Sequence, residues 1–200
     1  MKRAALGFHM HSGWGVLVAV CGDINSLECI ARKRIVTTDP SIPGANQPYH
    51  YAVSLPLADA ERHLANCAAV SERLALAAVE EVVRELGARE YRIVGAAVLL
   101  ASGRRLPPLA KILAAHPLIH TAEGGFFRNA ASKACERLKI PVTAIREREL
   151  DDQAKQAFGN IASQVQSRVS TLGSSIGPPW TKDHKTAALA AAITLARWKS

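Results

Sequence analysis

The hydrophobic pattern of the chain changes its period along the sequence, and this change limits the folds that the chain can adopt. Residues 4–9 and 14–22 are short apolar runs, and residues 27–36 alternate apolar with polar side chains. The second run is rich in β-branched residues, which favour strands, and a Gly-Asp pair at Gly22 closes it as a hairpin turn would. Three strands joined by short links form an antiparallel meander. We therefore expect the chain to begin with three sequential antiparallel strands.

A helical repeat follows these strands. Apolar residues recur every three or four positions between Leu64 and Leu86, which predicts a long helix that ends near Gly87. The intervening residues 37–56 contain four prolines and predict an irregular connection, of the kind that is often functional or mobile. Residues 91–101 are almost continuously apolar, as in a buried central strand.

The remaining sequence predicts mostly helix. We expect helices over residues 122–138, 149–172 and 181–198, a short buried strand at 141–145 and a helix-breaking segment at 173–179. Thr181 can cap the last helix, where the helix dipole favours an acidic side chain in the first turn.

This order of elements is similar to that of the ribonuclease H-like fold. It predicts one α/β domain over residues 1–200, with a mixed five-stranded sheet of three antiparallel and then parallel strands, and with helices on both faces. Aromatic residues make up only 5% of the chain, so the core must consist largely of Ala, Val, Leu and Ile. Alanine-rich helices packed on such a sheet fit this composition, and they also suit self-association as a homodimer.

The charge of the chain favours an anionic partner. The formal net charge is +8, which would attract DNA or RNA through a nonspecific field, although many cytosolic proteins without such a partner are as basic. Arg104 and Arg105 follow the predicted central strand in a loop bounded by Gly and Pro, and Lys182 and Lys185 lie at the start of the last helix. We expect these four side chains to contact phosphates.

The cysteines and the hydropathy pattern predict a cytoplasmic protein. The four cysteines form no C-x-x-C pair and no zinc-ligand spacing, which favours reduced thiols in a reducing compartment. No apolar run approaches the roughly 20 residues that span a bilayer, so we expect no membrane association. The segment before Cys21 imitates a lipoprotein signal, but His9 and His11 interrupt its apolar region.

Two segments resemble the RuvC-type Holliday-junction resolvases. Leu6-Gly-Phe-His-Met-His-Ser12 with the following Gly-Trp-Gly-Val resembles their first two strands, and the helix from Asp183 to Thr194 looks like their last helix. The resemblance implies a nucleic-acid-binding protein that uses a divalent metal, Mg²⁺ or Mn²⁺. The motifs His120-Thr-Ala-Glu-Gly124 and Gly177-Pro-Pro-Trp-Thr181 resemble an uncharacterised bacterial family, which implies no activity.

The chain departs from the resolvase pattern at the metal-binding positions. His9 stands where these enzymes place an aspartate on the first strand, and Ala187 replaces an acid of the last helix. His184 lies where some resolvases also have histidine, whereas residues 92–101 contain no acid. Histidine suits Zn²⁺ or Mn²⁺ better than Mg²⁺, which prefers hard oxygen ligands. A standard two-metal nuclease is therefore not expected.

Two clusters of candidate ligands follow from spacing. His9 and His11 alternate on a strand and would share one face as metal ligands, or would simply hydrogen-bond to loops. His116, His120 and Glu123 would gather on one helical turn, with Glu123 as a catalytic acid or metal ligand, or only as an acid at a helix start.

The last helix supplies a third group. In a ribonuclease H-like fold its start lies beside the first strand, so Asp183 and His184 could converge on His9; the alternative is a capped helix with a solvated first turn. The complete expected site has the catalytic residues Glu123, Asp183 and His184 and the metal ligands His9, His11, Glu123 and Asp183.

Three functions stay open at this point. The first is a nucleic-acid-binding protein, either a divergent metal-dependent nuclease or a catalytically lapsed relative. The second is an enzyme for a small phosphorylated or carboxylated substrate, with residues 37–56 as a lid. The third is a structural or partner-binding protein without catalysis.

Overall fold

The computed structural model describes residues 1–23, 25–100 and 105–198. Its sheet has the strand order β3-β2-β1-β4-β5, in which β1 pairs antiparallel with β2 and parallel with β4, and β5 is parallel to β4. This mixed sheet confirms the fold expected from the sequence. The strands are β1 (Lys2–Met10), β2 (Trp14–Cys21), β3 (Glu28–Val36), β4 (Tyr91–Leu100) and β5 (Val142–Arg146).

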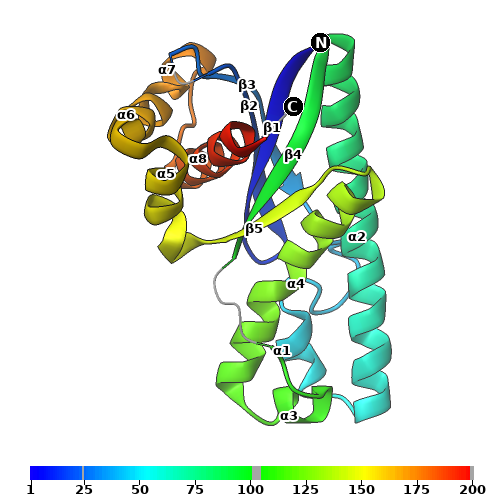
Figure 1. Ribbon diagram of the computed structural model, residues 1–200. Helices are drawn as coiled ribbons and strands as arrows, with labels where there is room; N and C mark the ends of the chain where they lie inside the picture. The colour runs from blue at the N-terminus through cyan, green and yellow to red at the C-terminus, as the bar shows by residue number, and fades with distance from the viewer. Residues whose placement is uncertain (24, 101–104, 199–200) are drawn as a thin grey trace.

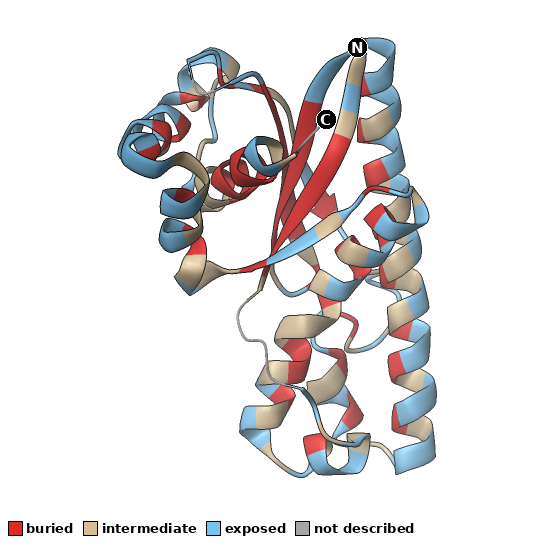
Figure 2. Cartoon of the chain, in the orientation of Figure 1, coloured by how far each residue is buried: buried red, intermediate tan, exposed pale blue. Residues whose placement is uncertain are grey.

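Helices cover both faces of this sheet (Figure 1). Helix α8 lies on one face together with α5, α6 and α7, whereas α2 and α4 lie on the other face. Figure 2 shows the central strands β1 and β4 largely buried between these two layers, whereas β5 is mostly exposed or half-buried. The helices are α1 (Pro48–Ala52), α2 (Leu57–Ala88), α3 (Leu109–Leu113), α4 (His116–Arg137), α5 (Leu150–Phe158), α6 (Ala162–Thr171), α7 (Gly173–Ile176) and α8 (Lys182–Arg197), with single 3₁₀ turns at Glu147–Glu149 and Gly159–Ile161.

The alanines of α8 allow this helix to lie very close to the central strand. A Cβ atom built on Gly7 of β1 would come within 1.9 Å of the carbonyl oxygen of Ala187. Ala187 and Ala191 are fully buried against the sheet. Small side chains on both elements thus fix the position of α8 over β1. The alanine-rich face of α8 is therefore covered within the chain.

A helical extension projects beyond the edge of the sheet at which β1 ends (Figure 1). We use this name for α1, α3 and the first halves of α2 and α4. It contains two small apolar clusters, one around Ala52 and Leu64 and one around Ile112 and Ile119. The extension is therefore held by much less apolar contact than the two main layers of the core.

The predicted boundaries were wrong in three places. The proline-rich connection 37–56 includes helix α1, whose Pro48 occupies the first turn, where proline is tolerated. Helix α4 begins at His116 rather than near residue 122. The segment 173–179 starts with the short helix α7 before the chain turns at Gly177. Among the described residues, no helix has both the length and the apolar character required to cross a membrane.

Candidate functional site

Three parallel strands end at one edge of the sheet, and the candidate site lies there. The pairing register places the carboxyl ends of β1, β4 and β5 side by side. His9 lies near the end of β1, and Glu147 directly follows β5. Helix α8 starts beside them with Asp183 in its first turn. Open α/β sheets commonly bind ligands outside the carboxyl ends of their strands.

His9, His11 and Asp183 converge at this edge, as the sequence predicted, and we call them the edge cluster. The carboxylate of Asp183 lies 2.9 Å from Nε2 of His11 and 3.6 Å from Nδ1 of His9. The ligand atoms of the three side chains all lie within 4.8 Å of one another. The ring of His11 is stacked between those of His9 and Trp14, with centroid distances of 4.9 and 4.5 Å. These stacks hold His11 towards Asp183.

The two ring nitrogens of His9 face different groups. Nδ1 lies 2.8 Å from the hydroxyl of Thr186, which also lies within hydrogen-bond distance of the carbonyl oxygens of Lys182 (3.1 Å) and Asp183 (3.0 Å). Nε2 lies 3.9 Å from Oε2 of Glu147. His9 is buried, and this burial lowers its pKa below the ordinary value, although Asp183 and Glu147 act in the opposite direction. The neutral imidazole is the form that binds metals, through either ring nitrogen.

The segment Gly177–Thr181 sets the start of α8 and therefore the position of Asp183. Arg32 of β3 donates to the carbonyl oxygens of this segment, at 2.9 Å for Gly177 and 3.1 Å for Pro178, and also to that of Pro179. The indole of Trp180 donates to the carbonyl of Val169 (3.0 Å), as expected for a packing anchor. The Gly-Pro-Pro-Trp-Thr motif is thus an anchor for the helix that carries a site residue.

His184 takes no part in the edge cluster. It is buried, its Nδ1 accepts the backbone N–H of Thr181 (3.2 Å), and its ring stacks on Trp180 at 5.7 Å. The expected convergence of His184 on His9 was therefore wrong, because this side chain caps the helix instead. Thr181 is the N-cap residue, as predicted.

Basic side chains lie around the edge cluster. Arg128 of α4 donates from Nε to the carbonyl of Leu99 at the end of β4 (2.9 Å), and its charge faces Glu147. Burial lowers the pKa of this guanidinium below its ordinary value. Lys182 is exposed, with Nζ 3.8 Å from Oε1 of Glu147. Lys185 is half-buried, Arg105 is exposed, and Arg104 lies outside the described residues.

Two residues at this edge were missed by sequence reasoning. Glu147 follows a strand that was predicted, and the parallel arrangement alone would have brought it to the carboxyl edge. Arg128 was not among the expected phosphate contacts, although it is partly buried and bonded to a strand carbonyl. Its position depends on how α4 packs, which spacing does not show.

Glu123 lies in a different cluster from His9. Its Oε2 accepts the backbone N–H of Tyr49 (3.2 Å) and lies 3.1 Å from Nδ1 of His50. Burial raises the pKa of this carboxyl above its ordinary value, while His50 opposes the shift. The expectation that Glu123 would join His9 and Asp183 was wrong, because α4 turns this side chain towards α1. His116 and His120 lie beside His50, with which they form a second group of possible ligands.

The chemistry of the edge cluster fits a metal ion that accepts nitrogen ligands. Two imidazoles and the carboxylate of Asp183 converge there, with a second carboxylate at Glu147. Mixed nitrogen and oxygen donors suit Mn²⁺ or Zn²⁺, whereas Mg²⁺ favours oxygen donors alone. The donor set therefore agrees with the preference expected from His9.

A cavity of about 760 Å³ opens at the opposite end of the sheet. It is lined by the start of β1, the end of β2 and the end of α8, including Lys2, Cys21 and Trp198. The residues of the edge cluster do not line it. Its size alone does not make it the site, because its described lining residues include no comparable set of ligand side chains.

Comparisons with known proteins agree on the fold. No protein-family model and no curated protein matches the chain. The structure of RuvC from Thermus thermophilus in complex with a Holliday junction substrate aligns over 96% of this chain and 91% of its own, with a TM-score of 0.52 and 16% identity. A second Thermus thermophilus RuvC structure aligns over 95% and 92%, with a TM-score of 0.49 and 17% identity. The chain thus has the ribonuclease H-like fold of RuvC.

Proposed function

We propose that the chain is a metal-dependent enzyme that binds nucleic acid at the carboxyl edge of its sheet and hydrolyses phosphodiester bonds there. The observation that carries this proposal is the convergence of His9, His11 and Asp183 at the edge where β1, β4 and β5 end. The fold shared with RuvC, a protein solved with a Holliday junction substrate, supports a nucleic acid as the substrate. The proposal includes a cytoplasmic location, which the four free cysteines favour.

The ligands would be His9, His11 and Asp183, with Glu147 beside them. A divalent ion held by these groups would supply Lewis-acid stabilisation of the charge that develops on the phosphodiester oxygens. The chain's own residues prepare this site. Thr186 orients the ring of His9, and Trp14 restrains the ring of His11.

Basic side chains would position the phosphate backbone. Arg128 is held in place by the carbonyl of Leu99, so it presents a fixed positive charge to the edge. Lys182 lies at the start of α8, where backbone N–H groups also favour an anion. Arg105 and Lys185 would extend this contact along the nucleic acid. Arg104 would belong to the same contact by sequence, but it lies outside the described residues.

The presence of His9 favours an active enzyme that uses Mn²⁺ or Zn²⁺ over a catalytically lapsed relative. In a catalytically lapsed site the metal ligands would be expected to converge no longer on one point. Here His9, His11 and Asp183 point towards one another. A small substrate would require a closed pocket at this edge, with residues 37–56 as its lid. In the structure part of that segment forms α1, which packs against α2 and α4.

A cleavage series tests the proposal. Labelled branched DNA, duplex DNA and RNA–DNA hybrid are each incubated with the protein in Mg²⁺, Mn²⁺ or EDTA. We expect Mn²⁺-dependent cleavage of at least one substrate, with less or none in Mg²⁺ and none in EDTA. His11→Gln and Asp183→Asn should remove the cleavage, whereas the matched control Asp152→Asn on α5 should keep it.

Each remaining outcome has a definite meaning. A retarded but intact band in Mn²⁺ would show binding without hydrolysis and would make the chain a lapsed relative. If neither a band shift nor cleavage is seen at low salt, nucleic acid is not the substrate. Cleavage that survives in EDTA would exclude a metal-dependent mechanism.

A further inference from the structure

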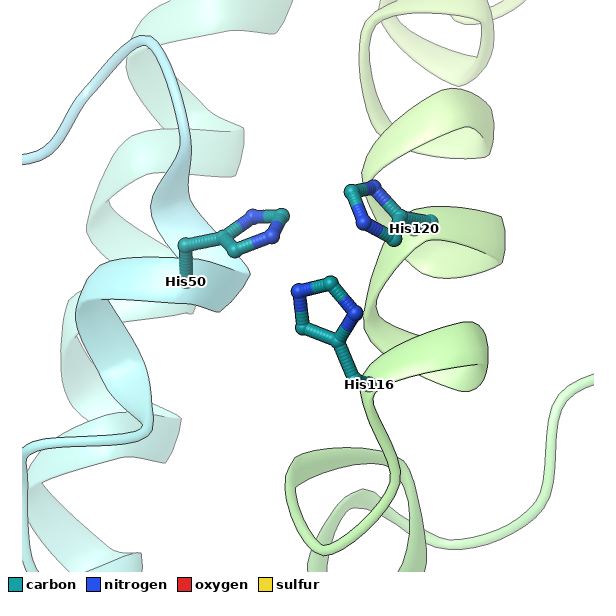
Figure 3. Close-up of side chains that lie close together, drawn as sticks. All are labelled: His50, His116 and His120. Atoms are coloured by element: carbon teal, nitrogen blue, oxygen red, sulfur yellow. The ribbon is translucent and has the colours of Figure 1, made fainter.

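Three histidines meet in the helical extension, outside the edge cluster. His50 comes from α1, whereas His116 and His120 come from consecutive turns of α4 (Figure 3). The centroid of the His50 ring lies 5.7 Å from that of His116 and 5.0 Å from that of His120, and the latter two are 4.4 Å apart. Each ring offers a nitrogen, and these nitrogens lie within 4.8 Å of one another.

The spacing of these histidines is that of a metal site on helices. Residues four apart lie on the same face of a helix, so His116 and His120 present their rings side by side. Zinc bound tetrahedrally by nitrogen at 2.0–2.1 Å requires ligand nitrogens about 3.3 Å apart. Both α4 histidines are exposed, so rotation of their side chains can close the remaining difference.

A buried carboxylate supports the third histidine from behind. Oε2 of Glu123 accepts Nδ1–H of His50 at 3.1 Å, which leaves the Nε2 lone pair of His50 available to a ligand. Glu123 is only 6% exposed, and its Oε1 has no hydrogen-bond partner among the residues that the structure describes. An unpaired buried carboxylate oxygen is costly unless a nearby positive charge compensates it. A cation bound to His50 would provide that compensation.

We propose that His50, His116 and His120 form a second metal site, which binds Zn²⁺ or a similar nitrogen-accepting ion. Glu123 is its positioning residue, because it orients His50 and fixes its tautomer. Three imidazoles fill three coordination positions and leave a fourth for water. The ion would join α1 to α4, and thereby stabilise the part of the molecule that has only small apolar clusters.

Metal counting on separate variants tests this site. The edge cluster is removed by His11→Gln with Asp183→Asn, and the second site by His116→Gln with His120→Gln. After treatment with a chelator and dialysis, each protein is titrated with Co²⁺, and its visible absorption and bound metal are measured. We expect the edge variant to bind one Co²⁺ with the strong absorption of tetrahedral cobalt. Adding the His116 and His120 changes to that variant should abolish this signal.

Two further variants separate ligation from a loss of folding. His63→Gln on α2 is the matched control, and it should bind Co²⁺ like the parent. Glu123→Gln should keep the tetrahedral spectrum while weakening the affinity by about 10–100-fold, as the loss of a hydrogen-bond partner behind a metal ligand does. The exposed positions of His116 and His120 make their replacement compatible with folding, which circular dichroism checks.

The site would also change local stability. Zn²⁺ should slow amide hydrogen exchange in residues 48–52 of the parent and of the edge variant, but not of the His116 and His120 variant. The proposal is overturned if the edge variant binds no Co²⁺ at protein concentrations near 100 µM. It is also overturned if binding persists unchanged after both α4 histidines are replaced.

Discussion

At the scale of single residues, His9 distinguishes this chain from metal enzymes that carry an aspartate at the end of the first strand. Its imidazole is buried and held by Thr186, and burial lowers its pKa, so it is neutral where a carboxylate would be charged. The choice between nitrogen and oxygen at this one position should decide which metal the site uses.

Replacing His9 with aspartate tests this directly. The His9→Asp variant would place a third carboxylate beside Asp183 and Glu147, which favours Mg²⁺ through its preference for hard oxygen ligands. We expect the ratio of cleavage rates in Mg²⁺ and Mn²⁺ to rise at least ~10-fold. An unchanged ratio would mean that residue 9 does not contact the metal. His63→Asp serves as a control for the general effect of the substitution.

The cysteines yield a second prediction at this scale. Burial raises the pKa of Cys29 to about 11 and that of Cys135 to about 12, and it also raises the pKa of Cys21 and Cys67. Because only the thiolate reacts, a disulfide reagent at pH 8 should label the native protein roughly 100-fold more slowly than the unfolded chain. Rapid labelling of two or more thiols in the native protein would contradict the burial.

Part of the site could be predicted from these residues, and part could not. His9 and His11 share a face because of strand alternation, and Asp183 meets them because the last helix of this fold starts beside the first strand. Glu123 belongs to one cluster with His116 and His120, as the spacing predicted, but not to the edge cluster, and its partner His50 was missed. Their pairing depends on a helix inside a proline-rich segment, which has no period to indicate it.

At the scale of elements, the contact between β1 and α8 positions the edge cluster. β1 carries His9, α8 carries Asp183, and Gly7 with Ala187 sets their separation. The strands were predicted well because each is a short apolar or alternating run bounded by turns. The ends of α1, α4 and α7 were not predicted well, because prolines and glycines mark a break in the hydrophobic pattern without showing whether a short helix follows.

A single methyl group at this contact should disturb both folding and the site. Gly7→Ala would place Cβ against the carbonyl oxygen of Ala187, so we expect a loss of about 1–3 kcal/mol in the free energy of unfolding, together with weaker metal binding at the edge cluster. Denaturant unfolding measures the first and metal titration the second.

The matched control for this change lies in α2. Gly87 is helical, and a Cβ atom there would meet no other atom within 4 Å. Gly87→Ala should therefore be neutral or stabilise the protein by up to about 1 kcal/mol. Equal effects of the two substitutions would show that close packing of α8 is not what holds it in place.

At the scale of the whole molecule, the two proposed metal sites occupy different parts of one architecture. The edge cluster lies where the sheet ends between its helix layers, and the second site lies in the helical extension. The net charge of +8 gives the molecule a field that attracts polyanions. The overall fold could be predicted because element order limits the possible topologies, whereas the extension follows from packing that no repeat in the sequence encodes.

The salt dependence of nucleic-acid binding should show how much individual basic side chains contribute to this attraction. Lys182→Gln and Lys185→Gln should each weaken binding to all sequences, and should each reduce the slope of log K against log salt concentration by about one. Lys155→Gln on α5, where the lysine pairs with Asp152, should leave the slope unchanged. Equal slopes for all three variants would place the nucleic acid elsewhere.

The most direct test of a metal-dependent active site at the carboxyl edge is the single-turnover rate at which the wild-type protein and Asp183→Asn cleave the preferred nucleic acid in Mn²⁺. We expect cleavage by the wild-type protein and a rate at least ~100-fold lower for the variant. The variant loses a carboxylate that would bind the metal, while its fold and its nucleic-acid binding remain. Equal rates for the two proteins, or no cleavage by either, would contradict a metal-dependent active site at the carboxyl edge.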